Sequence, residues 1–201
     1  MMSDLVKETY DELDRRAQGG GGLTGVSSGF RELDNLTAGL QKGDLIIIAG
    51  RPSMGKTAFA LNIAEHAALA DEEPVAVFSM EMSASSLAQR MISSLGRVNS
   101  HSMRTGKLEE RDWNRIDGAI QQIKNAPIYI DDTPSLTPIE LRARARRIQR
   151  EKGLSLILID YLQLMQVHGN KENRATEISE ISRNLKALAR ELNVPIIALS
   201  Q

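Results

Sequence analysis

A glycine-rich stretch that ends in a lysine and a threonine carries the clearest chemical signal in the sequence. Residues Gly50 to Thr57 have the spacing Gly-x-x-x-x-Gly-Lys-Thr of a phosphate-binding loop, and an apolar run rich in β-branched residues, 45–49, precedes them. Gly50 and Gly55 let backbone N–H groups turn toward an anion, and the helix expected from Lys56 adds the positive end of its dipole. The strand before the motif and the alanine-rich helix after it favour nucleotide binding over a chance Gly-Lys-Thr in a loop.

Two side chains at the end of this loop have the types that phosphate chemistry needs. Lys56 would reach the β- and γ-phosphates of ATP, and the Thr57 hydroxyl would ligate a Mg²⁺ that bridges them. We expect the nucleotide to contact the whole loop, which comprises Gly50, Arg51, Pro52, Ser53, Met54, Gly55, Lys56 and Thr57.

Two carboxylates follow apolar runs farther along the chain. The run 156–159 ends in Asp160, the form of a Walker B element, whose carboxylate would hold the Mg²⁺ opposite the loop. Tyr161 comes next, so this strand supplies no adjacent catalytic glutamate. Glu81, just past the run 75–80, would instead accept a hydrogen bond from the attacking water. The alternative for Glu81 is an acid that the dipole of the following helix favours.

A glutamine ends the sequence directly after a last apolar run. Gln201 follows 196–200, and its amide can both donate and accept a hydrogen bond, which suits a sensor of the γ-phosphate. A frayed terminal residue is the alternative.

Strands and helices alternate along the chain. Apolar runs predict strands at 45–49, 75–79, 128–131, 154–160 and 195–200, and amphipathic segments between them predict helices. One helix places Trp113, Ile116, Ile120 and Ile123 at core spacing, and another begins at the capping box Thr137-Pro138-x-Glu140. The pattern predicts an α/β fold with a mainly parallel sheet, helices on both faces and the ligand at the carboxyl ends of the strands.

Composition bounds the class of protein. The 201 residues, 41% of them hydrophobic, suffice for one domain or a little more, and the net charge of −1 requires any nucleic acid to bind through a local patch. The absence of cysteine excludes disulfides and thiolate metal sites and suits a cytoplasmic location. We expect neither a signal peptide nor a membrane span.

The first residues have an organisation of their own. Segment 3–18 places an apolar stripe, Val6, Tyr10, Leu13 and Ala17, on a charged helix, and four glycines, 19–22, follow it. We therefore expect a tethered linker helix and joint at 1–22, followed by the α/β domain at 23–201. The stripe would lie on its own domain or dock on a neighbouring subunit.

An ordered set of motifs resembles the C-terminal domain of the bacterial replicative DNA helicase family, DnaB. The resemblance extends from about Leu23 to the end of the chain. It is carried by Gly50-Arg-Pro-Ser-Met-Gly-Lys-Thr57, Phe78-Ser-Met-Glu-Met82, Arg104-Thr-Gly-Lys107, Tyr129-Ile-Asp-Asp132, Ile159-Asp-Tyr-Leu-Gln-Leu-Met165 and Pro195-Ile-Ile-Ala-Leu-Ser-Gln201.

The resemblance implies a RecA-like P-loop NTPase fold, with the strand of Gln201 inserted between the strands that precede Lys56 and Asp160. It implies catalytic roles for Glu81, Lys56 and Gln201, with Mg²⁺ held by Thr57 and Asp160. It also implies a homo-oligomeric, hexameric ring that binds single-stranded DNA, in which the linker helix packs on the adjacent subunit.

The sequence departs from the family pattern at both ends. The N-terminal domain that engages primase is absent, and so are the main DNA-contacting loop, further strands and the arginine finger that follow Gln201 in relatives. An arginine finger is worth about 10³–10⁵ in turnover for P-loop enzymes, so we expect the chain alone to be a weak or inactive ATPase. Primase and the helicase loader would bind through regions partly absent here.

Basic residues add candidate contacts to DNA or to other subunits. Arg142, Arg146 and Arg150 share a helical face, although such a run is usually a solvated surface. Lys171 and Arg174 follow the Walker B strand and are candidates for a central channel.

The leading hypothesis is an ATP-driven replicative helicase motor that unwinds duplex DNA, and the 5′–3′ direction is what the resemblance alone implies. The alternatives are a catalytically impaired nucleotide-binding and oligomerisation fragment of such a helicase, and a RecA- or RadA-like recombination ATPase.

Overall fold

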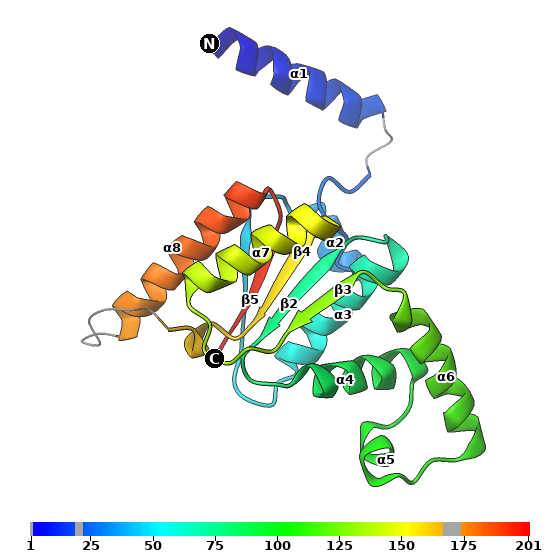
Figure 1. Ribbon diagram of the computed structural model, residues 1–201. Helices are drawn as coiled ribbons and strands as arrows, with labels where there is room; N and C mark the ends of the chain where they lie inside the picture. Colours follow the sequence, from blue (N-terminus) through cyan, green and yellow to red (C-terminus); the bar gives the residue numbers. More distant parts are fainter. Residues whose placement is uncertain (1, 19–21, 167–173) are drawn as a thin grey trace.

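Five parallel strands form the centre of the structure (Figure 1). The computed structural model describes residues 2–18, 22–166 and 174–201. The strands are β1 (Leu45–Ala49), β2 (Val75–Ser79), β3 (Ile128–Asp131), β4 (Leu156–Asp160) and β5 (Ile196–Ser200). Their order across the sheet is β1-β5-β4-β2-β3, and every neighbouring pair is parallel. The predicted insertion of β5 between β1 and β4 is confirmed.

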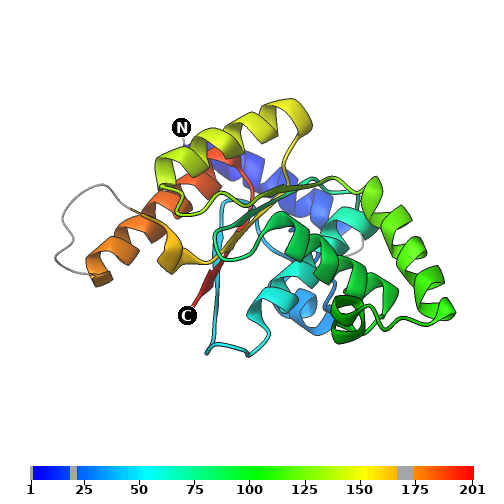
Figure 2. The ribbon, with the colours of Figure 1, turned by 60° about the horizontal axis from the view of Figure 1, so that its bottom comes forward.

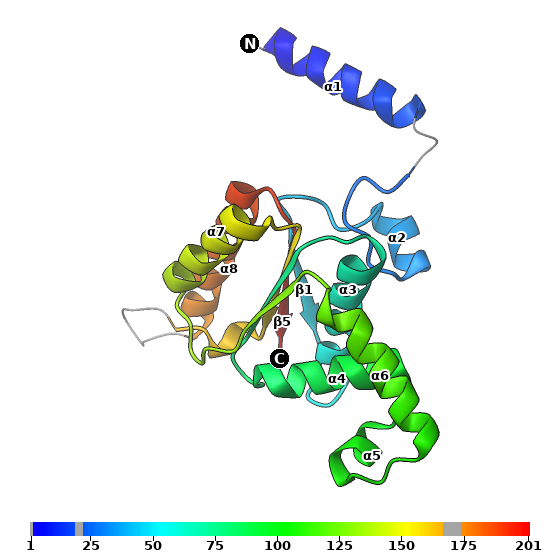
Figure 3. The same cartoon turned by 45° about the vertical axis from the view of Figure 1, so that its right-hand side comes forward.

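Helices cover both faces of this sheet, as predicted. The helices of the described residues are α1 (Met2–Gln18), α2 (Arg31–Thr37), α3 (Lys56–Ala70), α4 (Ala84–Gly96), α5 (Ser100–Thr105), α6 (Glu110–Lys124), α7 (Pro138–Lys152) and α8 (Arg174–Leu192), with a 3₁₀ turn at Leu162–Leu164. Figure 3 shows α7 and α8 on one side of the strands and α3 on the other. The alternation of strand side chains explains both layers, since Ala76 and Phe78 of β2 join the core under α7 and α8 while Val75 and Val77 join the core under α3 and α4.

The start of α7 is fixed by reciprocal hydrogen bonds. The Glu140 backbone N–H donates to Thr137 Oγ1 at 3.2 Å, and the Thr137 N–H donates to Glu140 Oε2 at 2.9 Å, with Pro138 at the first helical position. The predicted capping box is therefore confirmed.

We expect Thr137→Ala to lower the free energy of unfolding by about 1 kcal/mol, because an N–H at the helix start loses its acceptor. Chemical denaturation measures this loss. Thr176, an exposed threonine inside α8, is the matched control, and Thr176→Ala is expected to change the free energy by less than about 0.5 kcal/mol. Equal effects of the two substitutions would contradict the capping role.

A buried carboxyl group lies between α3 and α4. Glu65 of α3 is 5% exposed, its Oε2 accepts a hydrogen bond from Ser94 Oγ of α4 at 3.0 Å, and its Oε1 has no partner among the described residues. Burial raises the pKa of Glu65 from 4.5 to about 7, against the lowering effect of the Ser94 hydrogen bond. The folded protein therefore binds this proton more tightly than the unfolded chain does.

We expect the free energy of unfolding to fall as the pH rises from about 4.5 to 7. Over this range the unfolded chain has lost the Glu65 proton, whereas the folded protein still binds it and loses it at a free-energy cost. Glu65→Gln should remove most of this fall and should raise the free energy of unfolding above pH 7 by up to about 3 kcal/mol. Urea denaturation of the parent protein and of Glu65→Gln at a series of pH values measures the free energy of unfolding. Glu180→Gln, on the exposed face of α8, is the control. Parallel stability curves for the parent and Glu65→Gln would contradict the prediction.

Two expected core residues lie on the surface. Trp113 and Ile120 of α6 are 55% and 39% exposed, whereas Ile116 and Ala119 of the same helix are buried. The prediction was wrong because α6 packs mainly on α4 and not on the sheet, so only a narrow stripe of α6 is covered. The short helix α5 between α4 and α6 was also not predicted.

The N-terminal helix α1 forms as expected and lies apart from the α/β domain in Figures 1 and 3. Its side chains Leu5, Val6, Tyr10 and Leu13 are 56–70% exposed and thus do not pack on that domain. The glycine joint lies mostly outside the described residues, at 19–21, so the division at residue 22 stays a prediction. None of the helices described by the structure has the length and apolar character required to cross a membrane.

Candidate active site

The carboxyl ends of four strands meet around one cavity of about 610 Å³. Figure 2 looks toward this end of the sheet, where the loop between β1 and α3 and the terminus marked C lie close together. The cavity is lined by residues 52–58 of the loop and by Glu81, Asp160 and Gln201, together with Arg90 of α4. Side chains predicted from four separate stretches are thus gathered at one place.

The loop has a backbone that depends on glycine. Gly55 has φ of +84° and is the N-cap of α3, and Ser53 also has a positive φ of +64°. A residue with a Cβ atom at position 55 would be strained in this conformation. No side chain caps α3, so the N–H groups of its first turn are available to an anion in the cavity.

Not every residue of the predicted loop faces this cavity. Gly50 and Arg51 line a neighbouring depression of about 340 Å³ together with Ile48 and Phe59. The prediction that the whole loop contacts a nucleotide therefore stays a prediction at these two positions. Gly50 also approaches the Lys56 stem, because a Cβ atom at position 50 would lie 3.4 Å from Lys56 Cδ.

Lys56 lines the cavity from the first turn of α3. Its Nζ donates hydrogen bonds to the Gly50 and Arg51 carbonyl oxygens, the second at 3.5 Å. The ammonium group thus lies beside the loop, where it is predicted to bind the phosphates.

Thr57 and Asp160 meet across the cavity, although they are 103 residues apart in sequence. Thr57 Oγ1 donates a hydrogen bond to Asp160 Oδ2 at 3.1 Å. A hydroxyl and a carboxylate are the oxygen ligands that Mg²⁺ prefers, and this spacing would let both approach one ion. Within the described ranges there is no cluster of three or more His, Cys, Asp or Glu residues suited to a metal. The pair therefore fits Mg²⁺ whose remaining ligands are water and phosphate oxygens, and does not fit a metal enclosed by protein.

Asp160 is buried, with only 3% of its surface exposed. Burial raises the pKa of its carboxyl group and the charge of Glu81 adds to the rise, while the Thr57 hydrogen bond and the positive charges of Arg90 and Lys56 lower the pKa. A buried carboxylate with a second carboxylate nearby is a favourable position for a positive ion, because the ion offsets the cost of burying the negative charge.

Glu81 reaches the cavity from the segment between β2 and α4. Ser79 Oγ accepts a hydrogen bond from the Met82 N–H at 3.1 Å, and Asp132 Oδ2 accepts one from the Ala84 N–H at 2.8 Å. Ser83 is the N-cap of α4. The start of α4 is thus satisfied by other side chains, which favours the catalytic interpretation of Glu81 over the helix-terminus alternative.

Gln201 also lines the cavity, and its backbone is held by Gln163, a residue of the motif 159–165 for which the sequence analysis gave no role. Gln163 Nε2 donates to Ser200 Oγ at 2.8 Å and to the Gln201 carbonyl at 3.0 Å, and the Gln201 N–H donates to Gln163 Oε1 at 3.4 Å. These contacts hold the end of β5 in place and argue against a frayed residue.

The basic residues proposed for DNA contact are mostly paired. Arg142 Nη2 lies 2.5 Å from Glu191 Oε2, and Arg146 also pairs with Glu191. Hydrogen bonds and charges from these arginines hold the pKa of the Glu191 carboxyl below its usual value. Arg150 lies 3.9 Å from a carboxylate oxygen of Glu151, as expected for a solvated, ion-paired face. Of the two channel candidates, Arg174 pairs with Glu177, and Lys171 lies outside the described residues.

Comparisons with known proteins agree on one family. The model of the DnaB-like helicase C terminal domain matches residues 25–201. Replicative DNA helicase DnaB of Geobacillus stearothermophilus is 53% identical over 201 residues, which are 100% of this chain and 44% of that protein. Replicative DNA helicase DnaC of Bacillus subtilis strain 168 is 52% identical with the same coverage. The chain thus spans less than half the length of these relatives.

Solved structures are similar over nearly the whole chain. One of them, an ATPase domain, has a TM-score of 0.93 at 35% identity and matches 100% of this chain and 71% of its own. A DnaB-like replicative helicase studied in its interactions with primase has a TM-score of 0.88 at 36% identity, with 96% of this chain and 47% of its own covered.

Proposed function

The chain belongs to the DnaB-like helicase C-terminal domain family, and from this premise we propose that it is the ATP-driven motor domain of a replicative DNA helicase. The observation that carries the proposal is the single cavity lined by Lys56, Thr57, Glu81 and Asp160, in which Thr57 Oγ1 lies 3.1 Å from Asp160 Oδ2. The RecA- or RadA-like alternative is disfavoured, because the matching relatives are replicative helicases.

In the proposed reaction ATP is the substrate and Mg²⁺ the cofactor. Lys56 and the N–H groups at the start of α3 bind the phosphates, while Thr57 and Asp160 would hold the Mg²⁺, which neutralises phosphate charge when bound. Glu81 accepts a proton from water as the water oxygen forms a bond to the γ-phosphorus. The bond from that phosphorus to the bridging oxygen breaks, and ADP and inorganic phosphate are released. Gln201 senses the γ-phosphate.

The assembly follows from the family and from the exposed helix. We propose a hexameric homo-oligomer in the cytoplasm that encloses single-stranded DNA and unwinds the duplex in the 5′–3′ direction. In this ring, α1 docks on an adjacent subunit through Leu5, Val6, Tyr10 and Leu13, whose exposure leaves them free to pack elsewhere. Interaction with primase is proposed by analogy with the DnaB-like relative.

Steady-state ATP hydrolysis, measured with and without single-stranded DNA, tests the function. Turnover that requires Mg²⁺ and rises with DNA supports the motor. Binding of a fluorescent ATP analogue without turnover supports the alternative of a catalytically impaired nucleotide-binding and oligomerisation module. Failure of the protein to bind ATP at all contradicts both interpretations.

We expect Asp160→Asn to raise the Mg²⁺ concentration needed for half-maximal ATP binding at least about tenfold, because one negative ligand is lost while the shape is kept. Titration of Mg²⁺ against bound ATP analogue measures this. Asp117→Asn, on the exposed face of α6, is the control and should leave the titration unchanged. An unaltered Mg²⁺ requirement in Asp160→Asn would remove Asp160 from the metal site.

A further inference from the structure

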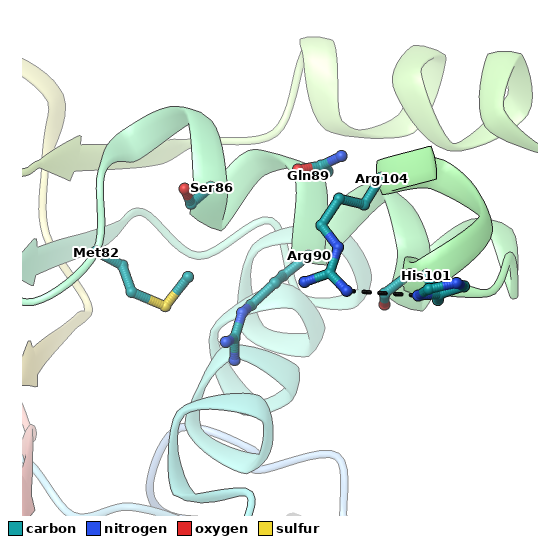
Figure 4. A pocket seen from close by; sticks show the side chains of 7 residues that line it. Met82, Ser86, Gln89, Arg90, His101 and Arg104 are labelled. Atoms are coloured by element: carbon teal, nitrogen blue, oxygen red, sulfur yellow. Dashed lines mark hydrogen bonds between the residues drawn. The ribbon is translucent and has the colours of Figure 1, made fainter. Parts of the chain in front are cut away.

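A second cavity, of about 300 Å³, lies between α4 and α5. Figure 4 shows the side chains that line it, including Arg90 and Gln89 of α4, Arg104 and His101 of α5, and Met82. We call this cavity the Arg90–Arg104 pocket. Neither the proposed chemistry nor the family motifs give it a role.

Two cationic side chains line the Arg90–Arg104 pocket. Its lining includes two guanidinium groups, a histidine, a glutamine and hydroxyl groups, and no carboxylate. Among the residues that the structure describes, no carboxylate lies within ion-pair distance of Arg90 or Arg104, in contrast to Arg142 and Arg146 of α7. The two unpaired arginines therefore give this cavity a local positive charge, whereas the whole chain has a net charge of −1.

The donor groups suit a compact oxyanion. Arg104 Nη2 lies 3.4 Å from His101 Nδ1, so His101 holds one edge of the guanidinium and leaves its other N–H groups for a ligand. Planar guanidinium groups present several N–H donors that match the oxygens of phosphate. Ser86 and Gln89, which also line the pocket, add neutral donors.

The pocket adjoins the nucleotide cavity. Met82 and Arg90 line both cavities, and Met82 follows directly after Glu81, the proposed base. Arg90 therefore lies at the boundary between the two cavities, where its guanidinium group is near an anion in either one.

We propose that the Arg90–Arg104 pocket binds inorganic phosphate and receives the ion that hydrolysis releases in the neighbouring cavity. The source of the ion rests on the proposed ATPase function, whereas the binding itself does not. Arg104 is the side chain that separates the two sites, because it lines this pocket and not the nucleotide cavity.

Equilibrium dialysis of radiolabelled inorganic phosphate, at pH 7.5 and constant ionic strength set with chloride, tests the proposal. The protein is first saturated with ADP and Mg²⁺, so that the phosphate-binding loop is occupied. We expect saturable binding of one phosphate that Arg104→Gln weakens at least about tenfold, because charge-assisted hydrogen bonds are lost. Arg115→Gln, an exposed arginine of α6 that lines neither cavity, should bind phosphate as the parent protein does.

Two further measurements keep this test separate from the proposed function. ADP binding is measured in the same samples, and its absence would count against the nucleotide site alone. Lys56→Ala then removes the loop lysine and should retain the phosphate site. Phosphate binding that is lost in Lys56→Ala but kept in Arg104→Gln would overturn the proposal, as would the absence of phosphate binding in the parent protein. Circular dichroism of Arg104→Gln verifies that the variant is folded.

Discussion

When this chain replaces the matching segment of a full-length relative, Glu81→Gln is expected to lower ATP turnover by about 10²–10⁴-fold while ATP and Mg²⁺ still bind. Glutamine has nearly the same shape but cannot take the proton of the attacking water. The segment around Glu81 should keep its conformation, because Ser79 and Asp132 hold it through the N–H groups of Met82 and Ala84.

Single-turnover hydrolysis and analogue binding, measured on the same protein, separate chemistry from affinity for this variant. Glu180→Gln on exposed α8 is the control and should hydrolyse ATP as the parent does. Turnover of Glu81→Gln at the parental rate would remove Glu81 from the role of base and return it to the helix-terminus alternative.

Replacing Lys56 with alanine is expected to weaken ATP binding by about 100-fold or more, and hydrolysis with it. The ammonium group lies within the cavity beside the loop carbonyls, where its charge acts at close range on a triphosphate. Loss of the Lys56 charge is thus expected to weaken ATP binding itself. Loss of the Glu81 carboxylate is expected to slow only the hydrolysis of bound ATP.

Isothermal titration with ATP and Mg²⁺ measures the affinity of the Lys56→Ala variant. Lys124→Ala, at the exposed end of α6, provides the comparison and should bind ATP with unchanged affinity. An affinity of Lys56→Ala within a factor of about three of the parent protein would be incompatible with a phosphate-binding loop.

Much of this architecture follows from local patterns in the sequence. The capping box at Thr137 and Glu140 predicted the start of α7, and apolar runs predicted the strands to within two residues, because both depend on neighbouring residues alone. The strand order, in contrast, was predicted from the family resemblance, because an apolar run does not indicate which other strand will pair with it. The structure confirms the order, with β5 between β1 and β4.

The supporting residues of the site could not be predicted in this way. Arg90, Asp132 and Gln163 contact the site or hold its backbone through partners distant in sequence. Asp132 and Gln163 lie within motifs that carry the family resemblance, but neither the motifs nor the periodicity indicated these contacts, and Arg90 lies in none of those motifs. Trp113 was assigned to the core from its spacing, but spacing does not reveal that α6 covers only another helix. Helical periodicity predicts which face is apolar and leaves open how much of that face is covered.

The pairing of β2 with β4 makes the site sensitive to substitutions at buried positions of these two strands. Ser79 lies opposite Asp160 in this pairing, and Phe78 lies opposite Ile159, both wholly enclosed. Side chains on a strand alternate in direction, so a slip by a single position would turn Asp160 away from Thr57. Substitutions at Phe78 or Ile159 that disturb this pairing are therefore expected to impair the proposed ATP hydrolysis, although neither side chain touches a nucleotide.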